Sequence, residues 1–147
     1  MTRPTAVLTH LATLCAGGTG LVYAWVLYLA GPPEDEFALV NHPWQPEVLA
    51  AHVLTSPLLV FACGFLWPLH VLGKLRAKNP ERRRTGLSLA LLVGPMVASG
   101  YLLQVTVAEG PRQAWVVLHV ASSILWLVTY GVHLCLPASG STPKEAR

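Results

Sequence analysis

Residues 113–136 read QAWVVLHVASSILWLVTYGVHLCL, a stretch that holds two histidines and no charged side chain and ends before Pro137. A helix needs about 20 mostly apolar residues to cross the hydrocarbon core of a bilayer, so these residues predict a membrane-spanning helix. Three stretches upstream meet the same criterion, and the first of them stops at the turn Gly-Pro-Pro, residues 31–33. The predicted fold is an all-α transmembrane four-helix bundle with spans at about residues 5–30, 47–75, 85–108 and 113–136.

The composition agrees with a location in lipid. Of 147 residues, 53% are apolar and only 12% are charged, whereas about 25% are charged in a typical soluble domain. A soluble chain of this length could not bury so much apolar surface. We expect one transmembrane domain over residues 1–136, with a retained first helix and no internal repeat, followed by a polar, disordered tail over residues 137–147.

The distribution of Lys and Arg predicts the orientation. With four spans, both termini and the loop KLRAKNPERRR share one side of the membrane, and that side holds nine of the ten basic residues. Arg112 alone lies on the other side. The positive-inside rule therefore places both termini in the cytoplasm, as in a multi-pass protein of a bacterial-type inner membrane. The net charge of +3 does not indicate a nucleic-acid partner.

The three cysteines stand alone inside apolar runs. Without a C-x-x-C or C-x-x-C-H motif, the chain lacks the signatures of thioredoxin-like chemistry and of covalent haem attachment. We expect all three to be small buried apolar residues. They are Cys15, Cys63 and Cys135.

Four of the six histidines form two pairs inside predicted spans. His52 and His70 are eighteen positions apart on the second helix, and His119 and His133 are fourteen positions apart on the fourth. At about 100° per residue on an ideal α-helix, each pair points to nearly one side, with one member towards each membrane surface. Because both helices run inward, His52 and His119 share the outer level, and His70 and His133 share the inner level.

Two level pairs of imidazoles predict two haem b groups stacked through the bilayer. A bare zinc or copper ion needs three or four converging protein ligands, whereas a haem iron needs only two. His52 and His119 would hold the outer iron, and His70 and His133 the inner iron. The axial spacings, about 27 Å on the second helix and about 21 Å on the fourth, differ by about 6 Å. Helix tilt, with kinks at Pro57 and Pro68, would absorb part of this difference.

Glycines and one arginine complete the predicted cofactor site. Gly86 and Gly100 are fourteen positions apart on the third helix, at the two haem levels, where a haem requires close approach of backbone. On the first helix Gly17, with the nearby Gly18 and Gly20, would lie opposite the inner haem. Arg112 is the candidate partner for haem propionates on the outer side.

These residues resemble the four-helix dihaem cytochrome b core. The resemblance rests on His-x13-His on one helix, a matching pair on a neighbour and two glycines with the same separation on a third. The resemblance covers residues 5–136. Cores of this kind occur in the membrane cytochrome subunits of formate dehydrogenase, nickel–iron hydrogenase and quinol:cytochrome c oxidoreductase. The longer spacing from His52 to His70 departs from that pattern. The resemblance to the formate dehydrogenase type leaves His10 open as a replacement for His70 or His133 at the inner haem, although an interfacial histidine or a quinone-site residue is the favoured interpretation.

The expected function is electron transfer. Iron with two histidine ligands relays electrons instead of binding substrate, so we expect a path between a quinone and a redox partner protein, in an oxidoreductase subunit and not a complete enzyme. A haem-free anchoring or assembly subunit remains an alternative. A metal or proton transporter is disfavoured because the spans lack acidic partners. His42, in the loop sequence NHPW, is expected to be a capping residue beside Trp44 and not a ligand.

Overall fold

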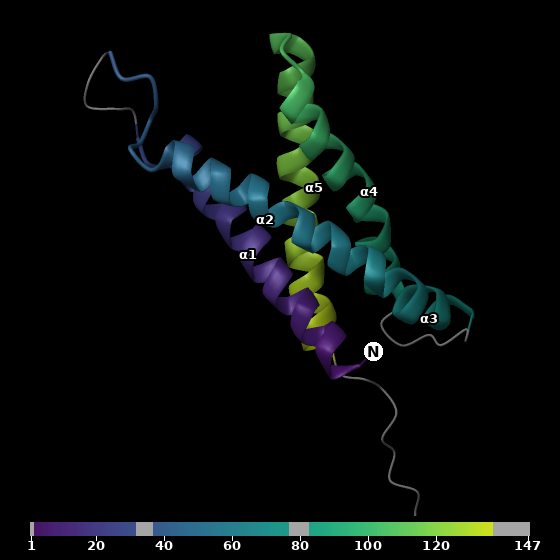
Figure 1. The fold of residues 1–147 in the computed structure, drawn as a ribbon. Coiled ribbons are helices and arrows are strands. Elements are labelled where there is room, and N and C mark those ends of the chain that lie inside the picture. Colours follow the sequence, from purple (N-terminus) through teal and green to yellow (C-terminus); the bar gives the residue numbers. More distant parts are fainter. Residues whose placement is uncertain (1, 32–36, 77–82, 137–147) are drawn as a thin grey trace, which may run out of the picture. The chain divides into compact units, whose positions relative to one another are not determined.

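The computed structural model describes residues 2–31, 37–76 and 83–136. These residues form helices and no strand (Figure 1). In chain order the elements are α1 (Arg3–Tyr28), α2 (Gln45–Leu66), the π-helical turn η1 (Trp67–Val71), α3 (Leu72–Arg76), α4 (Arg83–Val105) and α5 (Glu109–Cys135).

Among the described residues, four helical segments are long and apolar enough to cross a membrane: Arg3–Tyr28, Gln45–Arg76, Arg83–Val105 and Glu109–Cys135. The all-α class and the four predicted spans are thereby confirmed, with ends that differ by only a few residues. The second span is not one uniform helix, because α2, η1 and α3 follow one another within it.

The chain divides into two compact units, Met1–Leu69 and His70–Arg147. The first contains the helical hairpin α1–α2 and the second contains the hairpin α4–α5. The prediction of a single domain over residues 1–136 stays a prediction. The predicted tail, residues 137–147, lies outside the described residues.

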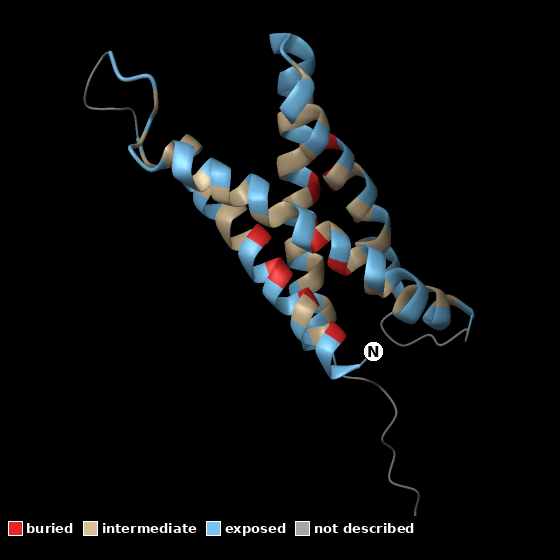
Figure 2. Ribbon diagram, viewed as in Figure 1, coloured by how far each residue is buried: buried red, intermediate tan, exposed pale blue. Residues whose placement is uncertain are grey.

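Small side chains hold α1 against α2. The buried residues of α1 include Thr5, Thr9, Ala12 and Ala16 (Figure 2), which follow one another at intervals of four, three and four positions. An average spacing of about 3.5 residues keeps one seam facing a partner in a left-handed helix pair. Small residues on such a seam let two helices approach closely, and the resulting van der Waals packing is one of the forces that associate helices in lipid.

The second hairpin is built on the same spacing. Met96 and Ser99 are buried on α4, and Ser122 and Trp126 on α5, at intervals of three and four positions. Large apolar residues such as Leu91 are exposed instead, Leu91 by 67%. An apolar exterior is the expected solution for a helix pair in hydrocarbon.

The expectation of buried cysteines is wrong for Cys15 and Cys135, which are exposed, and Cys63 is half-buried; none of the three forms a disulfide. A membrane helix is apolar on every side, so an apolar neighbourhood in the sequence does not tell which face is packed.

Pro68 lies in the π-helical turn, whereas Pro57 lies inside α2. Proline has no backbone N–H to donate to the carbonyl four residues before it, and π turns occur where that ladder is interrupted. The rotation of about 100° per residue applies to an α-helix. The shared direction expected for His52 and His70 therefore does not follow across this turn.

Replacing Ala62 with leucine tests the packing of the first hairpin. Ala62 is 1% exposed, so Ala62→Leu adds volume that the α1–α2 seam cannot accept and should destabilise the protein by about 1–3 kcal/mol. Ala50→Leu is the matched control, because Ala50 is exposed on the same helix. Thermal unfolding in detergent micelles gives the midpoint of each variant. Equal midpoints for the two variants would contradict the packing of Ala62 in the α1–α2 seam.

Candidate functional site

His52 of α2 reaches across the first hairpin to α1. Its Nδ1 lies 3.1 Å from the Ala16 carbonyl oxygen and 3.3 Å from the Thr19 hydroxyl. A Cβ on Gly20 would come within 2.9 Å of the His52 Cε1, closer than real Cβ atoms come. A carbonyl can only accept, so Nδ1 is the donor and carries the ring proton. The lone pair of the neutral imidazole is thereby assigned to Nε2.

His119 of α5 repeats this arrangement in the second hairpin. Its Nδ1 lies 3.0 Å from the Met96 carbonyl oxygen and 3.4 Å from the Ser99 hydroxyl. A Cβ on Gly100 would stand 3.0 Å from the His119 Cε1 and 3.3 Å from its Nδ1. The acceptor carbonyl again precedes the glycine by four positions, and the hydroxyl residue precedes it by one.

His133 forms a third set near the other end of the same hairpin. Its Nδ1 lies 2.8 Å from the Thr85 hydroxyl. A Cβ on Gly86 would stand 3.7 Å from its Cε1, an ordinary van der Waals distance. We call each set of a histidine, the glycine beside it and the preceding hydroxyl residue a histidine cradle, named after its histidine.

The two cradles of the second hairpin are related by matched spacings. His119 and His133 are fourteen positions apart on α5, and Gly86 and Gly100 have the same separation on α4. This separation is two heptads, so a helix pair with a seam of about 3.5 residues per turn returns to the same contact after about 21 Å. Gly86 therefore lies against His133 and Gly100 against His119, and the prediction that these glycines stand at two haem levels stays a prediction.

The cradles also reveal an internal repeat that the sequence analysis missed. His-Val-Leu-Thr-Ser begins at His52, and His-Val-Ala-Ser-Ser begins at His119. In the first, the Thr55 hydroxyl donates to the carbonyl four positions before it at 2.8 Å, and Ser122 of the second does the same at 2.6 Å. The repeat is visible in the sequence as the pattern His-Val-x-(Ser/Thr)-Ser. A pattern of five positions with conservative changes is too short to stand out in an apolar chain.

The glycines of the first helix need a correction. Gly20 lies against His52, the histidine assigned to the outer level, so placing it opposite the inner level was wrong. Gly17 is half-buried, and Gly18 has nothing within 4 Å of a Cβ position. Because the three glycines of α1 stand so close together in the chain, spacing alone could not select the correct one.

The remaining candidate residues lie outside the cradles. His70 is half-buried in η1, and His10 is exposed on α1. His42 is the expected loop cap, because its Nδ1 accepts the backbone N–H of Trp44 at 3.1 Å and its ring lies 5.3 Å from that indole. Arg112 is exposed in the first turn of α5, seven positions and therefore about 10 Å before His119 along the helix axis.

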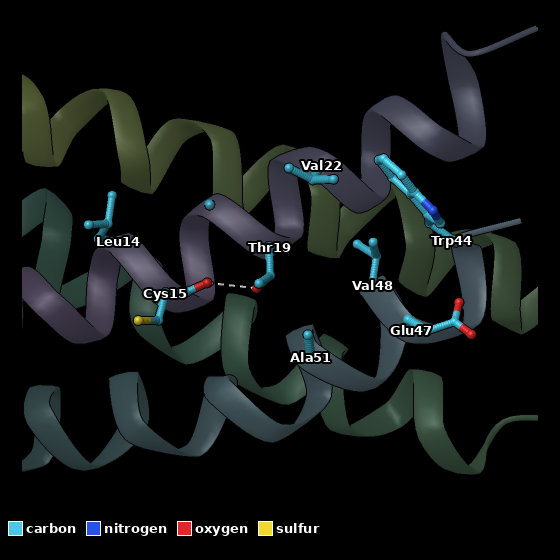
Figure 3. Close-up of a pocket in the computed structure, with 9 residues that line it drawn as sticks. Leu14, Cys15, Thr19, Val22, Trp44, Glu47, Val48 and Ala51 are labelled. Carbon is cyan, nitrogen blue, oxygen red and sulfur yellow. Dashed lines mark hydrogen bonds between the residues drawn. The ribbon is translucent and has the colours of Figure 1, made fainter. Parts of the chain in front are cut away.

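An open groove runs beside the His52 cradle at the start of α2 (Figure 3). It has a volume of about 450 Å³ and mainly apolar walls. Thr19 belongs both to the groove and to the cradle, and its hydroxyl donates to the Cys15 carbonyl at 2.7 Å. The lining residues are Leu14, Cys15, Gly18, Thr19, Val22, Trp44, Glu47, Val48 and Ala51.

Within the described part of the chain, no three or more His, Cys, Asp or Glu side chains gather as a group that could hold a metal ion. No family model matches the chain, and neither a curated protein nor a solved structure matches it.

Adding a methyl group at Gly100 should dislodge His119. Because the new Cβ would stand 3.0 Å from Cε1, Gly100→Ala should break the bond from Nδ1 to Met96 and cost about 1–3 kcal/mol. Gly94→Ala on the same helix is the control, since nothing lies within 4 Å of that position. Ring-nitrogen NMR shifts report the tautomer, and an unchanged His119 signal in Gly100→Ala would refute the contact.

Proposed function

We propose that this chain is a b-type dihaem cytochrome that relays electrons across the bilayer. His52 and His119 would be the axial ligands of the outer iron, and His70 and His133 those of the inner iron. The observation that supports this best is the repeated cradle, in which a histidine inside a candidate membrane span is fixed through Nδ1 to the neighbouring helix.

The cradle is suited to haem ligation for a chemical reason. Histidines that bind metal commonly donate their other ring N–H to a carbonyl or similar acceptor, which fixes the ring and raises the basicity of the ligating nitrogen. In His52 and His119 the donor is Nδ1, so Nε2 is the ligating atom. Haem supplies an iron that gains and loses one electron, and it needs only two protein ligands.

The spacing within the second hairpin supports two redox centres instead of one. The separation of His119 and His133 along α5 corresponds to about 21 Å of helix, in a hydrocarbon core about 30 Å thick. Two irons at those levels would divide the path of an electron across the membrane into shorter transfer steps. Arg112, exposed about two turns before His119, would pair with a propionate of the outer haem.

The electron partners would be a quinone and a redox protein. The connection between α4 and α5 is only residues 106–108, too short for a catalytic domain, so we assign the chain to a larger complex as a membrane subunit. Unaided electron transfer from a quinol to a soluble acceptor by the purified chain would contradict that assignment.

A second candidate uses the same hydrogen bonds differently. The bond from His52 to Ala16 and that from His119 to Met96 also join the two helices of each hairpin, and interhelical polar bonds contribute about 0.6–2 kcal/mol in membranes. A haem-free anchoring or assembly subunit would need the histidines for that alone. Counting haem separates the two candidates.

A reduced-minus-oxidised spectrum of the purified protein, with a pyridine haemochrome count, should give two b haems per chain. Substituting either member of the outer pair, as in His119→Ala, should remove about one haem per chain, because iron loses a ligand. His42→Ala is the control, since His42 caps a loop, and should retain both haems. A well-folded protein without haem would favour the anchoring candidate.

Both termini are expected in the cytoplasm of a bacterial-type inner membrane. Alkaline phosphatase fused after Val107, in the α4–α5 connection, should therefore be active, because that enzyme needs disulfides that form only outside the cytoplasm. Fusion after Arg147 should be inactive, and a green fluorescent protein at that position should fluoresce. The opposite pattern would invert the proposed topology and exchange the inner and outer levels.

A further inference from the structure

The groove beside the His52 cradle has a polar end and an apolar end. Figure 3 shows Trp44 and Glu47 at one end of the groove and Leu14 at the other. Glu47 is exposed, and it is the one charged side chain among the residues that line the groove. All of the lining residues belong to the first hairpin and the loop before α2, so the groove is complete within one compact unit.

The polar end lies where the second candidate span begins. That span starts at Gln45, directly after Trp44, and tryptophan is enriched where a membrane meets water because its ring is amphipathic. From Val22 the groove follows α1 to Leu14, eight positions away in the sequence, which is about 12 Å along the helix axis. A molecule in the groove would therefore have its polar group at the membrane surface and an apolar chain in the hydrocarbon.

Hydrogen bonds hold the aromatic wall at the polar end. The Asn41 side-chain amide donates to the Leu27 carbonyl at 3.2 Å, and the Asn41 backbone N–H donates to the Gln45 Oε1 at 2.9 Å. These bonds join the loop before α2 both to the end of α1 and to the start of α2. Trp44 packs against the His42 ring at 5.3 Å and is still 65% exposed. The indole is therefore held in place while much of it stays open to a ligand, which lowers the cost of binding.

We propose that this groove binds one phospholipid with a primary ammonium head group, of the ethanolamine class. An ammonium group is attracted by the face of an indole and by a carboxylate, and Trp44 and Glu47 supply both at the same end. An acyl chain follows the apolar walls towards Leu14. The volume of about 450 Å³ lies within the range of about 300–1,000 Å³ that is typical of small-molecule sites. Binding of this lipid requires no haem and no residue of the second hairpin.

The charge at the polar end determines which head group is preferred. A choline head group has no N–H, so it keeps the attraction to Trp44 but cannot donate a hydrogen bond to Glu47. A glycerol head group leaves only the phosphate charge, which Glu47 repels. The expected order of affinity is therefore ethanolamine, then choline, then glycerol.

Native mass spectrometry of the full-length protein in detergent tests this order. Titration with phosphatidylethanolamine should give one bound lipid per chain. Its half-saturating concentration should be about tenfold below that of phosphatidylcholine, because only the primary ammonium donates to the carboxylate. Glu47→Gln should remove this preference. Glu109→Gln is the matched control and should keep it, since Glu109 is also exposed in the first turn of a helix but does not line the groove.

Filling the groove gives a second test that leaves its charge unchanged. Nothing lies within 4 Å of a Cβ on Gly18, so Gly18→Leu should fold and occupy the space of the acyl chain. This variant should raise the half-saturating concentration of phosphatidylethanolamine at least about tenfold. Gly64→Leu is the control and should not change it, because a Cβ on Gly64 also has nothing within 4 Å and Gly64 does not line the groove.

Equal affinity for the ethanolamine and glycerol lipids would overturn the proposal, and so would a preference for ethanolamine over choline that survives Glu47→Gln. Unchanged binding in a folded Gly18→Leu protein would contradict the position of the acyl chain and overturn it as well. If a second copy of the chain covers the groove instead, the spectrum will show a dimer without bound lipid, which would also refute the proposal. None of these results changes the haem count, which tests the proposed function separately.

Discussion

The rest of each hairpin depends on a hydrogen bond from a histidine ring nitrogen to the helix beside it. In hydrocarbon an imidazole N–H without a partner would cost several kcal/mol, and the backbone of a regular helix has few accessible acceptors. A carbonyl four positions before a glycine is reachable because no Cβ blocks the ring, as at Gly20 and Gly100. The glycine, the spacing of the seam and the closeness of the helices therefore follow from one requirement.

That requirement explains which features could be read from the sequence. Span lengths and apolar composition determine the four helices, because only helices satisfy their own backbone in lipid. Gly86 and Gly100 could be matched to His119 and His133 from the sequence, because the two glycines have the same separation as the two histidines. Gly20 has no second glycine at the matching distance, so its role became visible only through its contact with His52.

Other features depend on contacts between helices that residue types alone do not determine. Thr19, Thr85 and Ser99 look like ordinary hydroxyl residues in apolar helices, where such side chains usually bond back to their own helix. Thr19 and Ser99 do so, and they also lie 3.3 Å and 3.4 Å, respectively, from a histidine nitrogen. The π-helical turn could not be predicted from the sequence either. Pro68 indicates an irregularity in the helix, but a kink and a π turn are both possible outcomes.

The two hairpins agree in one histidine cradle and differ in the second. His52 and His119 have matching carbonyl bonds, of 3.1 Å and 3.0 Å, and each lies against a glycine. At the other level His133 has a cradle, while the corresponding position of the first hairpin is Leu66. The next histidine of that span, His70, comes four positions later, within the π-helical turn. The repeat between the hairpins therefore holds for one histidine of each hairpin and fails for the second.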